Sequence, residues 1–232
     1  MTIDIVQRHA AVQARARLSL GASNDAIYQM VAGALASRGV AGGCIVDVGC
    51  GGGALWAVLG DRFDRYIGLD AVRYPGLPPH TDFRQVDLDA ADWPVASGEA
   101  DVVTALETIE HLENPWSFMR SLVRIARPGG RVVVTTPNQL SALSLLTLLL
   151  KRRFSAFQDV HYPAHRTALL ESDLVRMASA AGFDEIGITY SCRGRLPLTG
   201  AHIPAFVAGR LPRACSDNVL VIGRKPRGAD SR

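Results

Sequence analysis

A glycine-rich turn at residues 47–53 constrains the fold of this chain more than any other feature. The turn reads Asp-Val-Gly-Cys-Gly-Gly-Gly. It follows an apolar run, 44–48, that is typical of a buried strand, and it precedes a short helical stretch, 54–59. Glycine lets the backbone turn sharply and approach a ligand closely, because it has no Cβ atom. A strand, a glycine turn and a helix in this order indicate a ligand site at the end of a sheet strand.

Strand and helix patterns alternate along most of the chain. The predicted strands are 44–48, 65–70, 83–88, 100–106, 131–136, 186–190 and 219–222, and the predicted helices are 23–38, 54–59, 115–125 and 171–181. This alternation predicts an α/β fold with a Rossmann-like, doubly wound, mostly parallel sheet of seven strands. Only a stretch rich in Pro and Gly, 192–217, separates the last two strands, so we expect the last strand to insert antiparallel.

Three aspartates, Asp47, Asp70 and Asp87, stand at the carboxyl ends of the first three predicted strands. In open parallel sheets the ligand binds beyond the carboxyl ends of the strands. Asp47 beside the glycine turn would disfavour a pyrophosphate, but it suits the cationic amino group of S-adenosylmethionine. Asp70 can accept hydrogen bonds from two ribose hydroxyls, and Asp87 can accept one from the adenine amine. The set favours S-adenosylmethionine over NAD, whose sites also use a glycine loop.

These motifs, together with segments 101–115 and 126–138, resemble the ordered motifs of class I S-adenosylmethionine-dependent methyltransferases. The resemblance covers about residues 25–190. It implies methyl transfer from S-adenosylmethionine within a single domain, 1–232, in which 1–22 is an N-terminal extension and 139–168 is a lid over the acceptor. The implied cofactor site consists of Asp47, Gly49, Cys50, Gly51, Asp70, Ala71, Asp87, Leu88 and Leu106.

A Glu-x-x-Glu-His pattern, Glu107 to His111, follows the fourth predicted strand and should face the transferred methyl group. On a helical turn Glu107, Glu110 and His111 would lie together. The pattern is similar to that of ubiquinone-pathway O-methyltransferases and of small-RNA 2′-O-methyltransferases. In that resemblance the side chains hold a divalent metal with a downstream histidine. His165 suits that role better than His161, because a proline between them argues against a helical pair.

Three interpretations of these four residues stay open. In the first, a metal held by Glu107, Glu110, His111 and His165 lowers the pKa of an acceptor hydroxyl. In the second, no metal binds, and His111 or His165 is the general base. In the third, the segment only caps and packs. We predict methyl transfer to an oxygen of a small molecule; the alternatives are RNA 2′-O-methylation, a cofactor-binding module without turnover, and a dinucleotide-dependent oxidoreductase.

Residues 140–153 combine eleven mostly apolar positions with Lys151, Arg152 and Arg153. The segment is too short to span a bilayer, which takes about 20 residues. It fits either an interfacial helix that meets anionic lipid or a lid helix packed on the domain. Membrane contact would favour a lipid-linked acceptor, such as a polyprenyl-sugar or a quinone precursor.

Charge and cysteine content restrict the partners and the compartment. The net charge of +3 is mild and excludes the concentrated basic face that duplex nucleic acid needs. The four cysteines form no Cys-x-x-Cys pair, which indicates a reducing compartment and no structural zinc. The first 20 residues lack the apolar core of a secretory signal. We therefore expect a cytoplasmic enzyme with a small-molecule acceptor.

Overall fold

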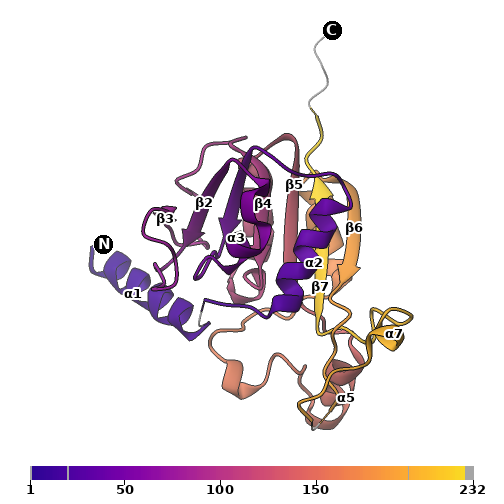
Figure 1. The fold of residues 1–232 in the computed structure, drawn as a ribbon. Helices are drawn as coiled ribbons and strands as arrows, with labels where there is room; N and C mark the ends of the chain where they lie inside the picture. Colours follow the sequence, from indigo (N-terminus) through magenta and orange to yellow (C-terminus); the bar gives the residue numbers. More distant parts are fainter. Residues whose placement is uncertain (1, 20, 198, 228–232) are drawn as a thin grey trace.

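A mixed sheet of seven strands forms the centre of the structure, a computed structural model that describes residues 2–19, 21–197 and 199–227 (Figure 1). The strands are β1 (Cys44–Val48), β2 (Arg65–Asp70), β3 (Asp82–Gln85), β4 (Ala100–Leu106), β5 (Ala126–Pro137), β6 (Asp184–Tyr190) and β7 (Asn218–Arg224). They lie in the order β3-β2-β1-β4-β5-β7-β6. Within the described sheet β7 alone runs opposite to the other six strands. The predicted seven-stranded sheet with an antiparallel last strand is confirmed.

Helices cover both faces of the sheet. The described α-helices are α1 (Thr2–Leu18), α2 (Asp25–Ala36), α3 (Ala54–Leu59), α4 (Pro115–Ile125), α5 (Ala142–Lys151), α6 (Glu171–Ala180) and α7 (Ala205–Ala208). Of these, α2, α3, α4 and α6 pack on the faces. Alternate strand side chains point to opposite faces: Ile45 packs in the core beneath α2 and α3, whereas Val46 packs in the core beneath α4 and α6. The Asn24 side chain accepts the N–H of Ile27 and so caps α2. Burial on both faces explains why the central strands β1 and β4 are mostly apolar runs.

Two strand boundaries differ from the prediction by three residues or more, and the others differ by at most two. β3 ends at Gln85 and not at residue 88, although Val86 and Leu88 are buried. These two side chains fill the core without pairing in the sheet, and burial alone produced the strand-like pattern. β5 begins at Ala126 and not at residue 131, because the Pro-Gly-Gly segment before residue 131 forms a bulge within the strand. Gly129 supplies the left-handed backbone, φ +78°, that the bulge requires.

The N-terminal extension is mostly helical, which the sequence analysis did not predict. Figure 1 shows α1, α5 and α7 at the edge of the sheet where the parallel strands end. The Tyr74 hydroxyl donates to the carbonyl of Ala16 at 2.5 Å, and the N–H of Gly52 donates to the carbonyl of Gly21 at 2.9 Å. The extension is therefore attached to the glycine turn.

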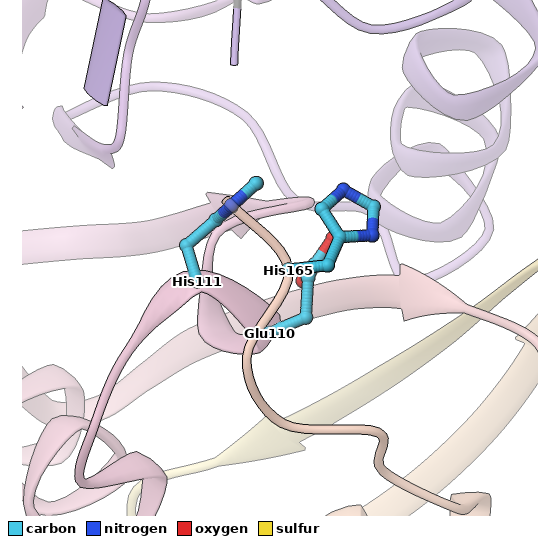
Figure 2. A group of neighbouring side chains, drawn as sticks. All are labelled: Glu110, His111 and His165. Atoms are coloured by element: carbon cyan, nitrogen blue, oxygen red, sulfur yellow. The ribbon is translucent and has the colours of Figure 1, made fainter. Parts of the chain in front are cut away.

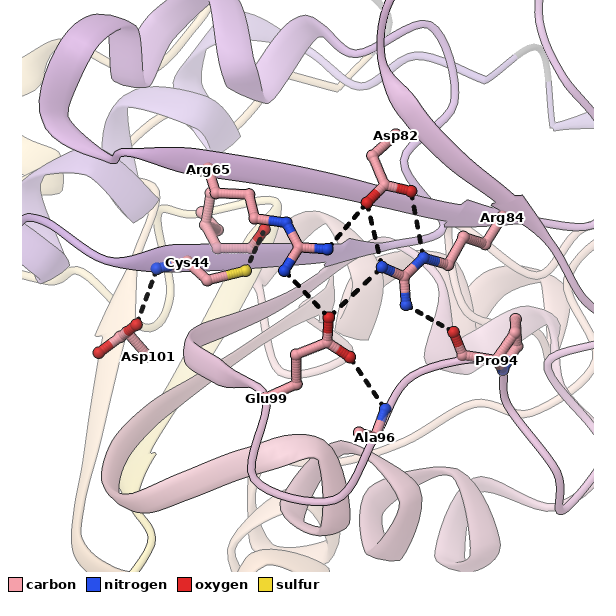
Figure 3. A network of polar contacts seen from close by, with 9 residues as sticks. Cys44, Arg65, Asp82, Arg84, Pro94, Ala96, Glu99 and Asp101 are labelled. Atoms are coloured by element: carbon pink, nitrogen blue, oxygen red, sulfur yellow. Dashed lines mark hydrogen bonds and ion pairs between the residues drawn. The ribbon is translucent and has the colours of Figure 1, made fainter.

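An ion-pair network joins the strand starts at the opposite edge of the sheet (Figure 3). Arg65 at the start of β2 contacts Asp82 at 3.0 Å and Glu99 at 3.2 Å. Arg84 contacts the same two carboxylates, and its hydrogen bond lowers the pKa of Asp82. Partly exposed pairs stabilise only modestly, so we assign the network to strand alignment, far from the strand ends that carry the predicted site.

Candidate active site

A cavity of about 440 Å³ lies where the parallel strands end. Eight of the nine predicted cofactor residues line it; the exception is Gly51. All four predicted catalytic residues, Glu107, Glu110, His111 and His165, line it as well. Its walls also include residues of α1, the start of α2 and the segment 160–165. The volume is in the range of sites for small ligands and cofactors.

Asp47 is a buried carboxylate held in place from two sides. Its Oδ1 accepts the Thr104 hydroxyl at 2.8 Å, and its Oδ2 accepts the Tyr66 hydroxyl at 2.9 Å. Burial raises the pKa of Asp47 from 3.8 to about 6. Burial removes hydrating water from this carboxylate, and a cation placed beside it would stabilise its charged form. The cationic amino group of a cofactor would supply that charge.

Asp70 has a structural role as well as the predicted binding role. Its Oδ2 accepts the N–H of Gly51 at 3.0 Å, and its Oδ1 accepts the N–H of Ala71 at 2.7 Å. Burial raises its pKa. The N–H of Val72 also donates to Oδ1, at 3.5 Å. An ionised carboxylate offers about four lone-pair sites, so one remains, on Oδ2, for a ribose hydroxyl. Asp70 can therefore fix the glycine turn and bind a ligand at the same time.

The glycines of the turn allow other parts of the protein, and not only a ligand, to approach the backbone closely. A Cβ atom on Gly51, whose φ is +51°, would lie 2.0 Å from the carbonyl oxygen of Gly21. A Cβ atom on Gly49 would lie 2.2 Å from the Thr108 hydroxyl. Gly51 thus lets the N-terminal extension approach the turn, which explains why it does not line the cavity.

Asp87 follows β3, the strand at one edge of the sheet, and lines the cavity. Its Oδ1 accepts the N–H of Asp89 at 3.0 Å. Asp89 in turn pairs with Arg15 of α1 at 3.4 Å and accepts the N–H of Glu113 at 2.9 Å. This chain of contacts connects α1 to the wall of the cavity.

Glu107 does not share a helical turn with Glu110 and His111, so that geometric prediction is wrong. Glu107 has a φ of +48°, and a separate 3-10 turn, Ile109–His111, follows it. Its Oε1 accepts the Thr135 hydroxyl and its Oε2 accepts the Asn218 amide, both at 2.8 Å. Side chains of β5 and β7 therefore turn Glu107 toward the sheet. Burial, followed by the charge of Glu110, raises its pKa.

Glu110, His111 and His165 form a compact cluster (Figure 2), in which one ligand atom of each lies within 4.8 Å of the others. His111 Nδ1 contacts the Ala164 carbonyl at 2.9 Å, and His165 Nδ1 contacts the Ala156 carbonyl at 2.7 Å. A carbonyl only accepts, so each Nδ1 carries the proton and each Nε2 keeps a lone pair.

The buried carboxyl group of Glu110 completes this cluster. Its Oε2 accepts the Thr136 hydroxyl at 3.1 Å, whereas Oε1 has no partner among the described residues. A buried oxygen without a partner is costly. Two imidazole nitrogens and a carboxylate oxygen are the donor set of many divalent-metal sites, so these three residues fit a metal ion.

The histidines of the cluster are neutral at pH 7. Burial, together with the charge of His111, lowers the pKa of His165 to about 4, and burial also lowers the pKa of His111. Such a group accepts a hydroxyl proton weakly, because an effective general base has a pKa near the working pH. His161 stacks on His165 with ring centroids 5.5 Å apart, but its Nδ1 accepts the N–H of Gln158.

Several residues that position the site were missed by the sequence analysis. They are Arg15, Tyr66, Thr104, Thr135, Thr136 and Asn218. The available signal was the presence of single polar residues within otherwise apolar strands, such as Thr104 in β4. A buried hydroxyl in a strand needs a hydrogen-bond partner, and here those partners are the functional carboxyl groups.

Known proteins share both the sequence motifs and the fold. The sequence model of the methyltransferase-domain family matches residues 24–186. A probable S-adenosylmethionine-dependent methyltransferase of Mycolicibacterium smegmatis is 28% identical over 203 residues, which cover 84% of this chain and 71% of the relative. A ubiquinone biosynthesis O-methyltransferase of Aeromonas salmonicida is 28% identical over 166 residues, 67% of this chain and 70% of the relative.

The fold is shared with solved structures. A crystal structure of an S-adenosylmethionine-dependent methyltransferase from Archaeoglobus fulgidus has a TM-score of 0.62 at 16% identity, covering 85% of this chain and 94% of that chain. Its likeness concerns the fold, whereas the match over residues 24–186 concerns the sequence itself. The chain therefore belongs to the methyltransferase-domain family, as a class I enzyme that depends on S-adenosylmethionine.

Proposed function

We propose that this enzyme transfers the methyl group of S-adenosylmethionine to a hydroxyl oxygen of a small molecule, and that Glu110, His111 and His165 hold a divalent cation beside the acceptor. The observation that carries the proposal is the convergence of these three side chains on the wall of the cofactor cavity. The O-methyltransferase among the relatives supports oxygen as the atom that is methylated.

The cofactor residues would orient the methyl donor. In this proposal Asp47 binds the amino group of S-adenosylmethionine, Asp70 binds a ribose hydroxyl and Asp87 binds the adenine amine. The acceptor oxygen attacks the methyl carbon, the carbon–sulfur bond breaks, and its electron pair stays on sulfur to give S-adenosylhomocysteine. Alignment of the three atoms supplies much of the rate. When bound, a divalent cation would lower the pKa of the acceptor hydroxyl, whose proton passes to solvent.

The acceptor can be found with a labelled cofactor. The enzyme is incubated with a metabolite extract and S-adenosylmethionine that carries a ¹³CD₃ methyl group, and mass spectrometry identifies products that gain the label. We expect labelled methyl ethers of small molecules. Labelled RNA would establish the nucleic-acid alternative, a labelled amine or carbon would contradict O-methylation, and no labelled product would indicate a binding module without turnover.

The cation can be tested without the acceptor. Titration with Mn²⁺, followed by electron paramagnetic resonance, should show binding that Glu110→Gln and His165→Ala each weaken by about tenfold or more. His80→Ala, which removes an exposed histidine, is the matched control. If wild-type protein and both variants bind Mn²⁺ alike, these residues hold no cation. The general-base interpretation would then be tested by activity in the presence of a chelator.

We also propose that α5 contacts an anionic lipid surface. Leu149 and Leu150 are 79% and 72% exposed at the end of this helix, and Lys151 and Arg152 follow directly. Leucines that reach into a bilayer surface and cations that meet its phosphates are typical of interfacial helices. Among the described residues, no helix has the length and apolar character needed to cross a membrane.

The proposed location is the cytoplasm, with residues 139–168 as the lid over the acceptor. All four cysteines are free thiols, which supports a reducing compartment. His161 and His165 of the segment line the cofactor cavity, and Ser155 contacts the Ser144 hydroxyl of α5 at 3.2 Å. The same segment thus connects α5 with the cavity, and an acceptor held at a lipid surface would lie close to it.

A further inference from the structure

A second cavity, of about 640 Å³, adjoins the cofactor cavity. The two cavities share Asn24, Glu107, His161, His165 and Asn218 in their walls. A molecule in the second cavity would therefore reach His165, one member of the cluster in Figure 2, without occupying the cofactor site. This position is suited to an acceptor.

The second cavity is polar. Of its fourteen lining residues only Ala26, Pro137 and Ala156 are apolar. Arg193, Arg195 and His202 line one part of it, and they come from a segment beyond the family match at residues 24–186. The shared features of the family therefore do not account for these cations.

Asp217 orients the guanidinium of Arg195 and leaves the two terminal amino groups without a bond to any described residue. The Nε of Arg195 lies 2.5 Å from Asp217 Oδ2, and its backbone N–H donates to Asp217 Oδ1 at 3.3 Å. Asp217 thus fixes the guanidinium without using the nitrogens that bind oxyanions in pairs.

Arg193 has no ion pair with any residue that the structure describes. The other carboxyl groups at this cavity are Asp25 and Glu107. No ion pair joins Asp25 to either arginine in the described chain, and Glu107 is engaged by Thr135 and Asn218. The positive charge of Arg193 therefore has no ion-pair partner among the residues that the structure describes, and it is available to a ligand.

We infer that the second cavity binds the methyl acceptor, and that the acceptor carries an anionic oxygen group, a carboxylate or a phosphate ester, which Arg193 and Arg195 hold. Its hydroxyl then lies toward the cluster of Glu110, His111 and His165. The inference rests on the proposed function, because it assigns a substrate class to that site.

Benzoate, phenyl phosphate and phenol test this inference, since they share a ring and differ in charge. They are added to the full chain saturated with S-adenosylhomocysteine, and ¹⁵N NMR follows the side-chain Nε–H signals of arginine. Benzoate, phenyl phosphate or both should shift the signals of Arg193 and Arg195, and phenol should not. The anion that binds more tightly identifies the group as carboxylate or phosphate.

Variants separate this site from the rest of the surface. Arg193→Ala and Arg195→Gln should each weaken anion binding by about tenfold or more, because a charge-assisted hydrogen bond is lost. Arg210→Ala, which removes an exposed arginine outside the cavity, should bind the anions like the wild type. Affinity for S-adenosylhomocysteine should stay unchanged in all three variants, which also shows that they are folded.

Three results would overturn the inference: equal shifts with phenol, unchanged anion binding in both cavity variants, or no shift at about 10 mM of either anion, ten times a Kd of about 1 mM. A neutral acceptor whose O-methylation ignores Arg193→Ala would overturn it too and would leave the proposed function intact. If the two arginines bind the anion but no O-methylated product forms, the anion site is supported and the proposed O-methylation is contradicted.

Discussion

The affinity of this enzyme for its cofactor should depend on the ionisation of Asp47. Burial raises the pKa of this carboxyl group to about 6 in the cofactor-free protein. Thr104 and Tyr66 keep it oriented, and it lines the cofactor cavity. The proposed partner is the amino group of the cofactor, which stays protonated below its pKa of about 7.7 or more. The perturbation is therefore a change of pH from 7 to 5.

The size of the effect follows from the fraction of Asp47 that is ionised. With a pKa of about 6, that fraction is about 0.9 at pH 7 and about 0.1 at pH 5. The cationic ligand binds the ionised form, so affinity rises with pH through 6 and levels off above it. Binding at pH 5 should be about tenfold weaker than at pH 7, a loss of about 1.4 kcal/mol.

Isothermal titration calorimetry with S-adenosylhomocysteine measures this dependence. Adenosine is the matched control ligand, because it lacks the amino acid part and its binding should not follow the Asp47 titration. Asp47→Asn should bind S-adenosylhomocysteine more weakly at pH 7 and should lose the dependence on pH. Equal affinity at pH 5 and pH 7, or an unchanged dependence in Asp47→Asn, would refute the assigned role of this carboxylate.

Three further outcomes are expected. Asp70→Ala should weaken S-adenosylhomocysteine binding by about 1.5–3 kcal/mol in calorimetry, since a ribose hydroxyl loses a charged acceptor; unchanged affinity would contradict its role. Gly51→Ala should lower the thermal unfolding midpoint more than Gly60→Ala, because both glycines have positive φ but only the Cβ at position 51 meets a carbonyl oxygen; equal shifts would contradict the clash. The wild type should sediment with anionic vesicles at low salt, whereas a Leu149→Ser, Leu150→Ser double variant should stay in the supernatant, and sedimentation of both alike would exclude α5 as the contact.

The sequence was sufficient to predict the sheet and to bring the proposed cofactor residues to one cavity, because both depend on local order. Each strand, turn and helix has a pattern of its own, and the carboxyl ends of parallel strands meet at one edge whatever the detailed packing. Asp47, Asp70 and Asp87 could therefore be placed around one cavity from their positions at the ends of successive strands. The antiparallel last strand followed from the missing crossover helix before it.

Only the tertiary structure decided how the four predicted catalytic residues are arranged. Glu107 faces the sheet because Thr135 and Asn218, which lie 28 and 111 positions away, bond its two oxygens. Glu110, His111 and His165 come together because segment 160–165 returns to the strand ends, and the second cavity joins residues 24–26 with residues 217–218. Such contacts depend on strand register and on how distant segments pack, and a local pattern of residues predicts neither of them.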